Sequence, residues 1–155
     1  MTSKVELKAL TLLRSAELTR DMETKHLRKL ASLASEIEFS EGELIYRKGD
    51  RGQALYLIEE GQVVVEITVP GQGQVTINTF SPGQFFGWSS LFPTGRKMAW
   101  TRAVKPTRAI AINANRLGAA CRFDHNLEYA LVRRAVRAMV DRIKVNRQQL
   151  VAVFA

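Results

Sequence analysis

The feature that most constrains the fold is a series of short apolar runs, separated by glycine, across residues 37–113. Runs rich in Val, Ile, Thr and aromatic residues are typical of strands, and glycine-containing breaks between them are typical of tight turns. The runs cover residues 44–46, 54–58, 63–69 and 75–80. Several short strands spaced this closely predict an antiparallel sandwich or jelly roll.

Helical patterns flank this region on both sides. Ser3 and Glu6 form a capping-box pattern that opens a helical stretch over residues 3–34. After residue 113, a short helix over 116–123 is interrupted around Asp124, and no glycine or proline follows Leu127. That last stretch can form one helix about 40 Å long. We therefore predict one α+β domain over residues 1–155, with a β-roll at 36–113 and C-terminal helices at 115–155.

The last helix carries two apolar stripes. The first has heptad spacing and contains one polar member; it consists of Tyr129, Val132, Val136, Met139, Ile143, Asn146, Leu150 and Val153. The second consists of Leu127, Leu131, Ala135 and Ala138, and is expected to pack on the β-core. We interpret the first stripe as a parallel homodimer interface in which Asn146 pairs with its symmetry mate. The alternative is that both stripes are buried within one chain.

Charge is distributed unevenly along the chain. Residues 1–95 carry 10 Lys and Arg against 12 Asp and Glu, whereas residues 96–155 carry 13 against 3. This asymmetry indicates an anionic ligand or partner near the C-terminal part, or simply a solvated basic helix face. Direct binding of nucleic acid by this basic part is a further possibility, although no motif supports it.

Other features narrow the class of protein. The single cysteine, Cys121, suits a reducing compartment, and the chain has neither a signal-peptide core nor an 18-residue apolar run. We therefore expect a cytoplasmic protein without a membrane span. His26 and His125 are not at metal-ligand spacing, and Cys121 has no accompanying histidine motif. The sequence predicts no catalytic site, no metal site, no cofactor and no enzymatic activity.

Several motifs together resemble the cyclic-nucleotide-binding domain, the sensor half of the catabolite activator protein and of protein kinase A regulatory subunits. They are the segments 39–50 (FSEGELIYRKGD) and 56–63 (YLIEEGQV), Gly83-x-x-Phe86-Gly87, and Ala99-Trp100-x-Arg102-Ala103. The resemblance covers about residues 20–150, with helix, β-roll and long helix in the family's order. Because the chain stops at Ala155, we expect no helix-turn-helix DNA-binding domain. The sequence resembles the stand-alone bacterial members of the family, in which a Gly-Trp-Ser segment also occurs.

The resemblance implies a ligand site in residues 83–100, where the family binds the nucleotide phosphate at a short helix. The expected ligand-binding residues are Gly87, Trp88, Ser89, Ser90, Leu91, Arg96, Lys97, Met98, Ala99 and Arg142. The family's ribose-binding glutamate is replaced by Trp88, which cannot accept a hydrogen bond, and its phosphate-binding arginine by Lys97. The backbone amides of residues 89–91 are expected to remain available for an anion.

These departures leave three functional hypotheses open. The leading one is a non-enzymatic, homodimeric sensor of a small anionic molecule, possibly a cyclic nucleotide, that acts on a separate effector protein. In the second, the chain binds cyclic AMP with Lys97 on the phosphate. In the third, it is a ligand-free interaction or scaffold module whose pocket is closed by Trp88. The Trp88 ring is expected either to stack on a flat ligand or to fill the core.

Overall fold

The computed structural model describes residues 2–91 and 96–154. In this part of the chain, eight strands form two antiparallel sheets, preceded and followed by helices, which confirms the predicted α+β β-roll. The elements in chain order are α1 (Lys4–Ser15), α2 (Thr24–Ser32), β1 (Ala34–Phe39), β2 (Leu44–Tyr46), β3 (Ala54–Glu60), β4 (Val63–Val69), β5 (Gly73–Phe80), β6 (Phe85–Phe86), the 3-10 turn η1 (Trp88–Leu91), β7 (Trp100–Ala103), β8 (Thr107–Asn113), α3 (Ala114–Phe123) and α4 (His125–Phe154).

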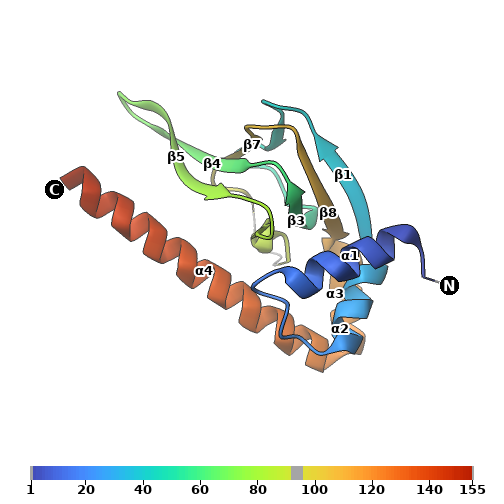
Figure 1. Ribbon diagram of the computed structural model, residues 1–155. Helices are drawn as coiled ribbons and strands as arrows, with labels where there is room; N and C mark the ends of the chain where they lie inside the picture. Colours follow the sequence, from blue (N-terminus) through green and yellow to red (C-terminus); the bar gives the residue numbers. More distant parts are fainter. Residues whose placement is uncertain (1, 92–95, 155) are drawn as a thin grey trace.

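The two sheets have the strand orders β1-β8-β3-β6 and β2-β7-β4-β5. Strands far apart in the sequence therefore lie side by side. β1 and β8, the first and last strands, pair along their length from Ala34 opposite Ile112 to Phe39 opposite Thr107. This long-range pairing returns the chain from β8 to the side where α1 and α2 lie, so that α3 and α4 begin beside the N-terminal helices (Figure 1).

Side-chain alternation along β3 divides the core in two. Successive residues of a strand point to opposite faces of a sheet. Leu55 and Leu57 belong to a cluster shared with the helices, whereas Tyr56 and Ile58 belong to a second cluster inside the β-roll. The sheet that contains β3 therefore has one face against the helical layer and the other toward the roll interior.

Local capping explains where the helices begin. The Ser3 hydroxyl accepts a hydrogen bond from the Glu6 amide at 3.1 Å, which confirms the predicted start of α1. At the predicted interruption, Asp124 Oδ1 accepts hydrogen bonds from the amides of Asn126 and Leu127, both at 3.1 Å. A side chain that satisfies free amides in this way stabilises a helix N-terminus by about 1 kcal/mol. Asp124 thus ends α3 and starts α4.

The long helix α4 begins beside α3 and runs past β5, and its C-terminal end lies far from α1–α3 (Figure 1). Leu127, Leu131 and Ala135 are buried, so the prediction that this stripe packs on the core is confirmed. Within the same chain, Asn78 Nδ2 of β5 donates to Asn146 Oδ1 at 3.5 Å, and the pairing of Asn146 with its symmetry mate stays a prediction. The predicted dimer remains a prediction.

Candidate anion-binding site

The segment between β6 and β7 forms the candidate site, and Gly87 gives it its shape. Gly87 has a φ of +89°, a region that residues with a Cβ rarely adopt. A Cβ here would also lie 2.8 Å from the Ala54 carbonyl oxygen. The backbone then enters η1, in which the Ser90 amide donates to the Gly87 carbonyl at 3.0 Å. That amide, expected to be available for an anion, is therefore already used within the turn.

Lys97 reaches back over this turn. Its Nζ donates to Ser89 Oγ at 2.8 Å and to Ser90 Oγ at 3.2 Å, and lies 4.3 Å from the centroid of the Tyr46 ring. Both backbone polar groups of Lys97 form hydrogen bonds to the segment before β3. The Lys97 amide donates to the Asp50 carbonyl, and the Lys97 carbonyl accepts from the Gly49 amide, both at 2.7 Å. The ammonium group is therefore positioned before any ligand arrives.

Gly52 permits this close packing, although no sequence pattern singled it out as a site residue. A Cβ on Gly52 would lie 2.0 Å from Ser90 Oγ and 2.9 Å from Lys97 Cε. Tyr46 was also predicted only as a strand residue. Its hydroxyl donates to the Ala54 carbonyl at 3.0 Å, and burial raises its pKa, so the ring under Lys97 stays neutral. The one sequence signal for Tyr46 was its place in a half-buried strand.

The electrostatics of the site favour an anion. Burial, followed by the charge of Arg142, lowers the pKa of Lys97 from its ordinary value of 10.5 to about 8. Burial also lowers the pKa of Arg142 on α4. Two positive groups thus share a partly dehydrated space. Since burying like charges together is unfavourable unless a counter-charge is present, the arrangement is suited to a negatively charged ligand.

A cavity of about 180 Å³ lies at this point. Its walls come from the β-roll interior, the Gly87 segment and α4, and are formed by Tyr46, Val65, Phe80, Phe86, Gly87, Trp88, Ser89, Arg96, Lys97, Met98, Ala99, Thr101 and Arg142. Three of these described residues are basic and none is acidic. Arg96 is exposed and donates through Nη1 to the Gly49 carbonyl at 3.0 Å. Arg142 is exposed as well, which leaves the half-buried Lys97 as the most deeply placed of the three cations.

The structure brings most of the predicted site residues to this cavity, including Arg142 from a distant helix. Ser90 joins it through its hydrogen bond to Lys97. Leu91 does not border the cavity, because it packs against the helix-side cluster. Met98 borders it but is 82% exposed.

Trp88 departs most from expectation. It is only 7% exposed, belongs to the helix-side cluster, and its ring centroid lies 5.4 Å from that of Phe85. Its Nε1 is buried without a hydrogen-bond partner among the described residues. Trp88 also forms part of the cavity wall, and the hypothesis that it closes the pocket to a ligand stays a hypothesis. Core packing is the reading that this environment supports.

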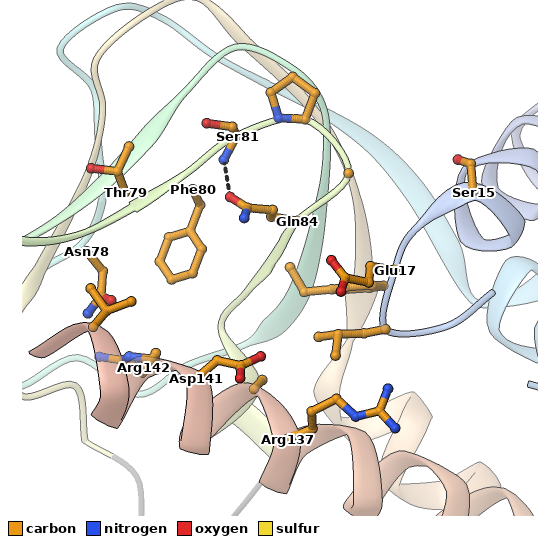
Figure 2. A pocket seen from close by; sticks show the side chains of 16 residues that line it. Ser15, Glu17, Asn78, Thr79, Phe80, Ser81, Gln84, Arg137, Asp141 and Arg142 are labelled. Atoms are coloured by element: carbon orange, nitrogen blue, oxygen red, sulfur yellow. Dashed lines mark hydrogen bonds between the residues drawn. The ribbon is translucent and has the colours of Figure 1, made fainter. Parts of the chain in front are cut away.

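A second, larger hollow of about 500 Å³ adjoins the first and shares Phe80 and Arg142 with it. It lies between the turn after α1, the β5–β6 turn and α4 (Figure 2). Figure 2 shows the Arg142 guanidinium beneath Asn78, whereas the neighbouring Asp141 carboxylate points the other way along the helix. Asp141 is therefore poorly placed to neutralise Arg142 on the side of Lys97.

Within residues 2–91 and 96–154, no three His, Cys, Asp or Glu side chains gather as a metal site requires. Among the described helices, even the 30-residue α4 is not apolar enough to cross a membrane.

Comparison with known proteins agrees with the geometry. A family model described as "Cyclic nucleotide-binding domain" matches residues 36–123. A proposed cyclic nucleotide-binding protein from Geobacter metallireducens GS-15 is 25% identical, with a TM-score of 0.77 over 87% of this chain and 98% of its own. A cyclic nucleotide-binding domain from Methylobacillus flagellatus KT is 21% identical, with a TM-score of 0.81 over 96% of this chain and 84% of its own.

A third solved structure comes from a eukaryotic kinase. The regulatory domain of Toxoplasma gondii PKA, crystallised with cAMP, is 21% identical, with a TM-score of 0.71 over 86% of this chain and 51% of its own. No curated protein gives a significant match. Because the family model covers more than half of the residues, the chain belongs to the cyclic nucleotide-binding domain family.

Proposed function

We propose that this protein is a cytoplasmic, non-enzymatic sensor that binds a small anion in the cavity at Lys97 and reports its presence to a separate effector protein. Domains of this family are regulatory. The observation that carries the proposal is the position of Lys97, half-buried between two serine hydroxyls and facing Arg142. A cation held in this way is stabilised by a ligand that supplies negative charge.

Cavity size and chemistry restrict the ligand. Pockets for drug-sized organic molecules measure roughly 300–1,000 Å³, so a space of about 180 Å³ suits the charged part of a ligand rather than a whole nucleotide. The phosphate of a cyclic nucleotide is the natural candidate in this family. Lys97 is a point charge and lacks the planar fork with which arginine binds phosphate through two hydrogen bonds. Trp88 cannot accept a hydrogen bond from a ribose hydroxyl, because its indole only donates. We therefore expect cyclic AMP to bind more weakly than about 10 μM, the level reached when one or two charge-assisted contacts are lost.

The proposed signal leaves the site through α4. Arg142 is on this helix, and Arg134 of the same helix donates to the Asp21 carboxylate at 2.8 Å, next to the N-terminal helices. Ligand contact at Arg142 is thus connected by one rigid element to the turn between α1 and α2. We propose that α4 forms the homodimer, and that α4 or the N-terminal helices present the effector surface.

The test is calorimetry with inorganic phosphate and with cyclic AMP. Lys97→Ala should weaken binding of either anion by about 1–3 kcal/mol, the usual range for a hydrogen bond to a charged group. Lys105→Ala is the matched control, because Lys105 is an exposed lysine in the turn before β8. Equal affinity of the wild type and Lys97→Ala would contradict the proposal, as would a failure of both anions to bind.

A further inference from the structure

A third cavity, of about 320 Å³, lies between α3, the first turns of α4 and the end of η1. It shares none of its described wall residues with the cavity at Lys97 or with the larger hollow next to that cavity. The buried part of its wall is apolar and consists of Leu117, Leu131 and Ala135. Its volume is at the lower end of the range for organic ligands, roughly 300–1,000 Å³. The space therefore suits one small hydrocarbon group.

Two opposite charges lie at the mouth of this cavity. Arg122 and Glu128 both line it, and both are exposed. Arg122 Nη1 lies 3.9 Å from the point where a Cβ on Gly118 would be, so the guanidinium extends back along α3 over the cavity wall. Among the described residues, no ion pair includes Arg122, and Glu128 has only His125, whose Nδ1 is 3.8 Å from Glu128 Oε1. Both charges are therefore accessible to a ligand.

Cys121 also lines the cavity and links its apolar and charged parts. Burial raises the pKa of the Cys121 thiol, and the negative charges of Glu128 and Asp124 add to this effect. The thiol therefore stays neutral and acts as a small apolar group in the wall. Asp124 already caps α4, because its Oδ1 accepts hydrogen bonds from two backbone amides. Glu128 is thus the better placed acid for a ligand at this mouth.

We infer that this cavity binds a large apolar α-amino acid, such as phenylalanine, with its side chain between α3 and α4. The Arg122 guanidinium suits the carboxylate of the ligand, because its planar fork can donate two parallel hydrogen bonds. The Glu128 carboxylate accepts hydrogen bonds from the ammonium group. The hydrocarbon side chain covers the apolar wall, which a small amino acid would leave exposed. This site is separate from the proposed anion site and does not depend on it.

Alkylation of Cys121 by N-ethylmaleimide measures occupation of the cavity, because the chain has a single cysteine. L-phenylalanine should slow this reaction, and calorimetry should give its Kd. Hydrocinnamate lacks the ammonium group and phenethylamine lacks the carboxylate. Each should bind about two- to tenfold more weakly than phenylalanine, because each loses one ionic contact at an exposed rim. L-alanine should not slow the alkylation.

Three variants locate the ligand. Gly118→Leu should abolish phenylalanine binding, because the new side chain enters the cavity. It should keep the fold, since a Cβ at Gly118 would meet only Arg122 Nη1, at 3.9 Å, and glycine is a poor helix former. Arg122→Gln and Glu128→Gln should each lower the affinity about two- to tenfold. Arg116→Gln is the matched control, because Arg116 is an exposed arginine of α3 outside the cavity wall, and it should bind as the wild type does.

Several results would overturn the inference. One is unchanged alkylation at about 10 mM L-phenylalanine, a level at which binding is too weak for a built site. Others are equal affinity for phenylalanine and either single-charge analogue, or undiminished affinity in Arg122→Gln and Glu128→Gln. Lys97→Ala should bind phenylalanine as the wild type does, and loss of binding in that variant would place the ligand in the other cavity. Failure at this site therefore leaves the anion site untouched.

Discussion

Replacing Lys97 by methionine should stabilise the unliganded protein while abolishing its anion binding. The Lys97 charge is half-buried and faces Arg142, and the described residues lining the cavity include no carboxylate. Methionine keeps a long flexible chain that can lie over the Tyr46 ring, and it removes the charge. A residue retained for ligand binding at the expense of stability behaves in this way.

The magnitude follows from the pKa of Lys97, which is lowered from 10.5 to about 8. One pKa unit corresponds to about 1.4 kcal/mol, so the unfavourable interaction is at most about 3 kcal/mol. Water screens part of it, because the side chain is not fully buried. Methionine also removes the donor that Lys97 supplies to Ser89 and Ser90, and a lost hydrogen bond lowers the free energy of unfolding by about 1 kcal/mol. We expect a net gain of about 1 kcal/mol, equivalent to a rise in Tm of about 2–4 °C.

The gain should depend on pH in a defined direction. Below about pH 7, Lys97 is charged in the folded and unfolded states, so the wild type carries the full unfavourable interaction. As pH rises from about 8 to 10.5, the folded wild type releases its proton before the unfolded chain does, and its stability recovers. The advantage of Lys97→Met should therefore be complete near pH 7 and absent above about pH 10.5.

Urea unfolding in chloride buffer without phosphate checks this prediction, with Lys105→Met as the exposed control. The difference in unfolding free energy between each variant and the wild type should be measured at pH 7 and again near pH 10. If Lys97→Met is less stable than the wild type at pH 7, the hydrogen bonds to the two serines outweigh the charge. Lys97 would then contribute to the stability of the unliganded fold, and would not be a cation that lacks its counter-charge.

Three further predictions concern the same segment. Gly87→Ala should destabilise the fold by about 1–3 kcal/mol in urea unfolding, since φ is +89° and the new Cβ would lie 2.8 Å from a carbonyl oxygen; wild-type stability would contradict this. Trp88→Ala should lower the free energy of unfolding by about 3–5 kcal/mol, because residue 88 lies in the core. For the same reason, Trp88→Glu combined with Lys97→Arg should fail to create tight cyclic AMP binding. Detection of such binding by calorimetry would show that residue 88 faces the ligand and not the core. Affinity for sulfate should fall as pH rises through about 8, because Lys97 loses its charge, and a flat calorimetric profile between pH 7 and 9 would exclude Lys97 as the ligand cation.

Much of the fold could be predicted because its signals are local. Alternation and glycine breaks gave β4 its bounds at residues 63–69, and the Asp124 cap separated α3 from α4 as expected. The turn at Gly87 and the position of Lys97 were also predicted, through the resemblance to the family. The strand bounds, the cap and the turn each depend on residues within a few positions of one another, so their order in the chain is enough. The place of Lys97, whose backbone bonds to Gly49 and Asp50, was predicted only through the family resemblance.

The direction of the Trp88 ring could not be predicted in the same way. Phe85 and Phe86 alternate between the helix-side cluster and the roll interior. The positive φ of Gly87 then interrupts the alternation, so counting residues no longer tells which side the next ring faces. Only the packing against Phe85 decides it.

The sequence by itself determined the order of strands, turns and helices, the basic character of the C-terminal part, and the segment where a ligand would bind. Only the tertiary structure decided that Lys97 and Arg142 face one cavity without an acidic neighbour among its described walls. The physical reason is that these residues are on separate elements, and the angle at which α4 crosses the β-roll depends on the whole buried stripe from Leu127 to Ala135. No local pattern encodes that angle.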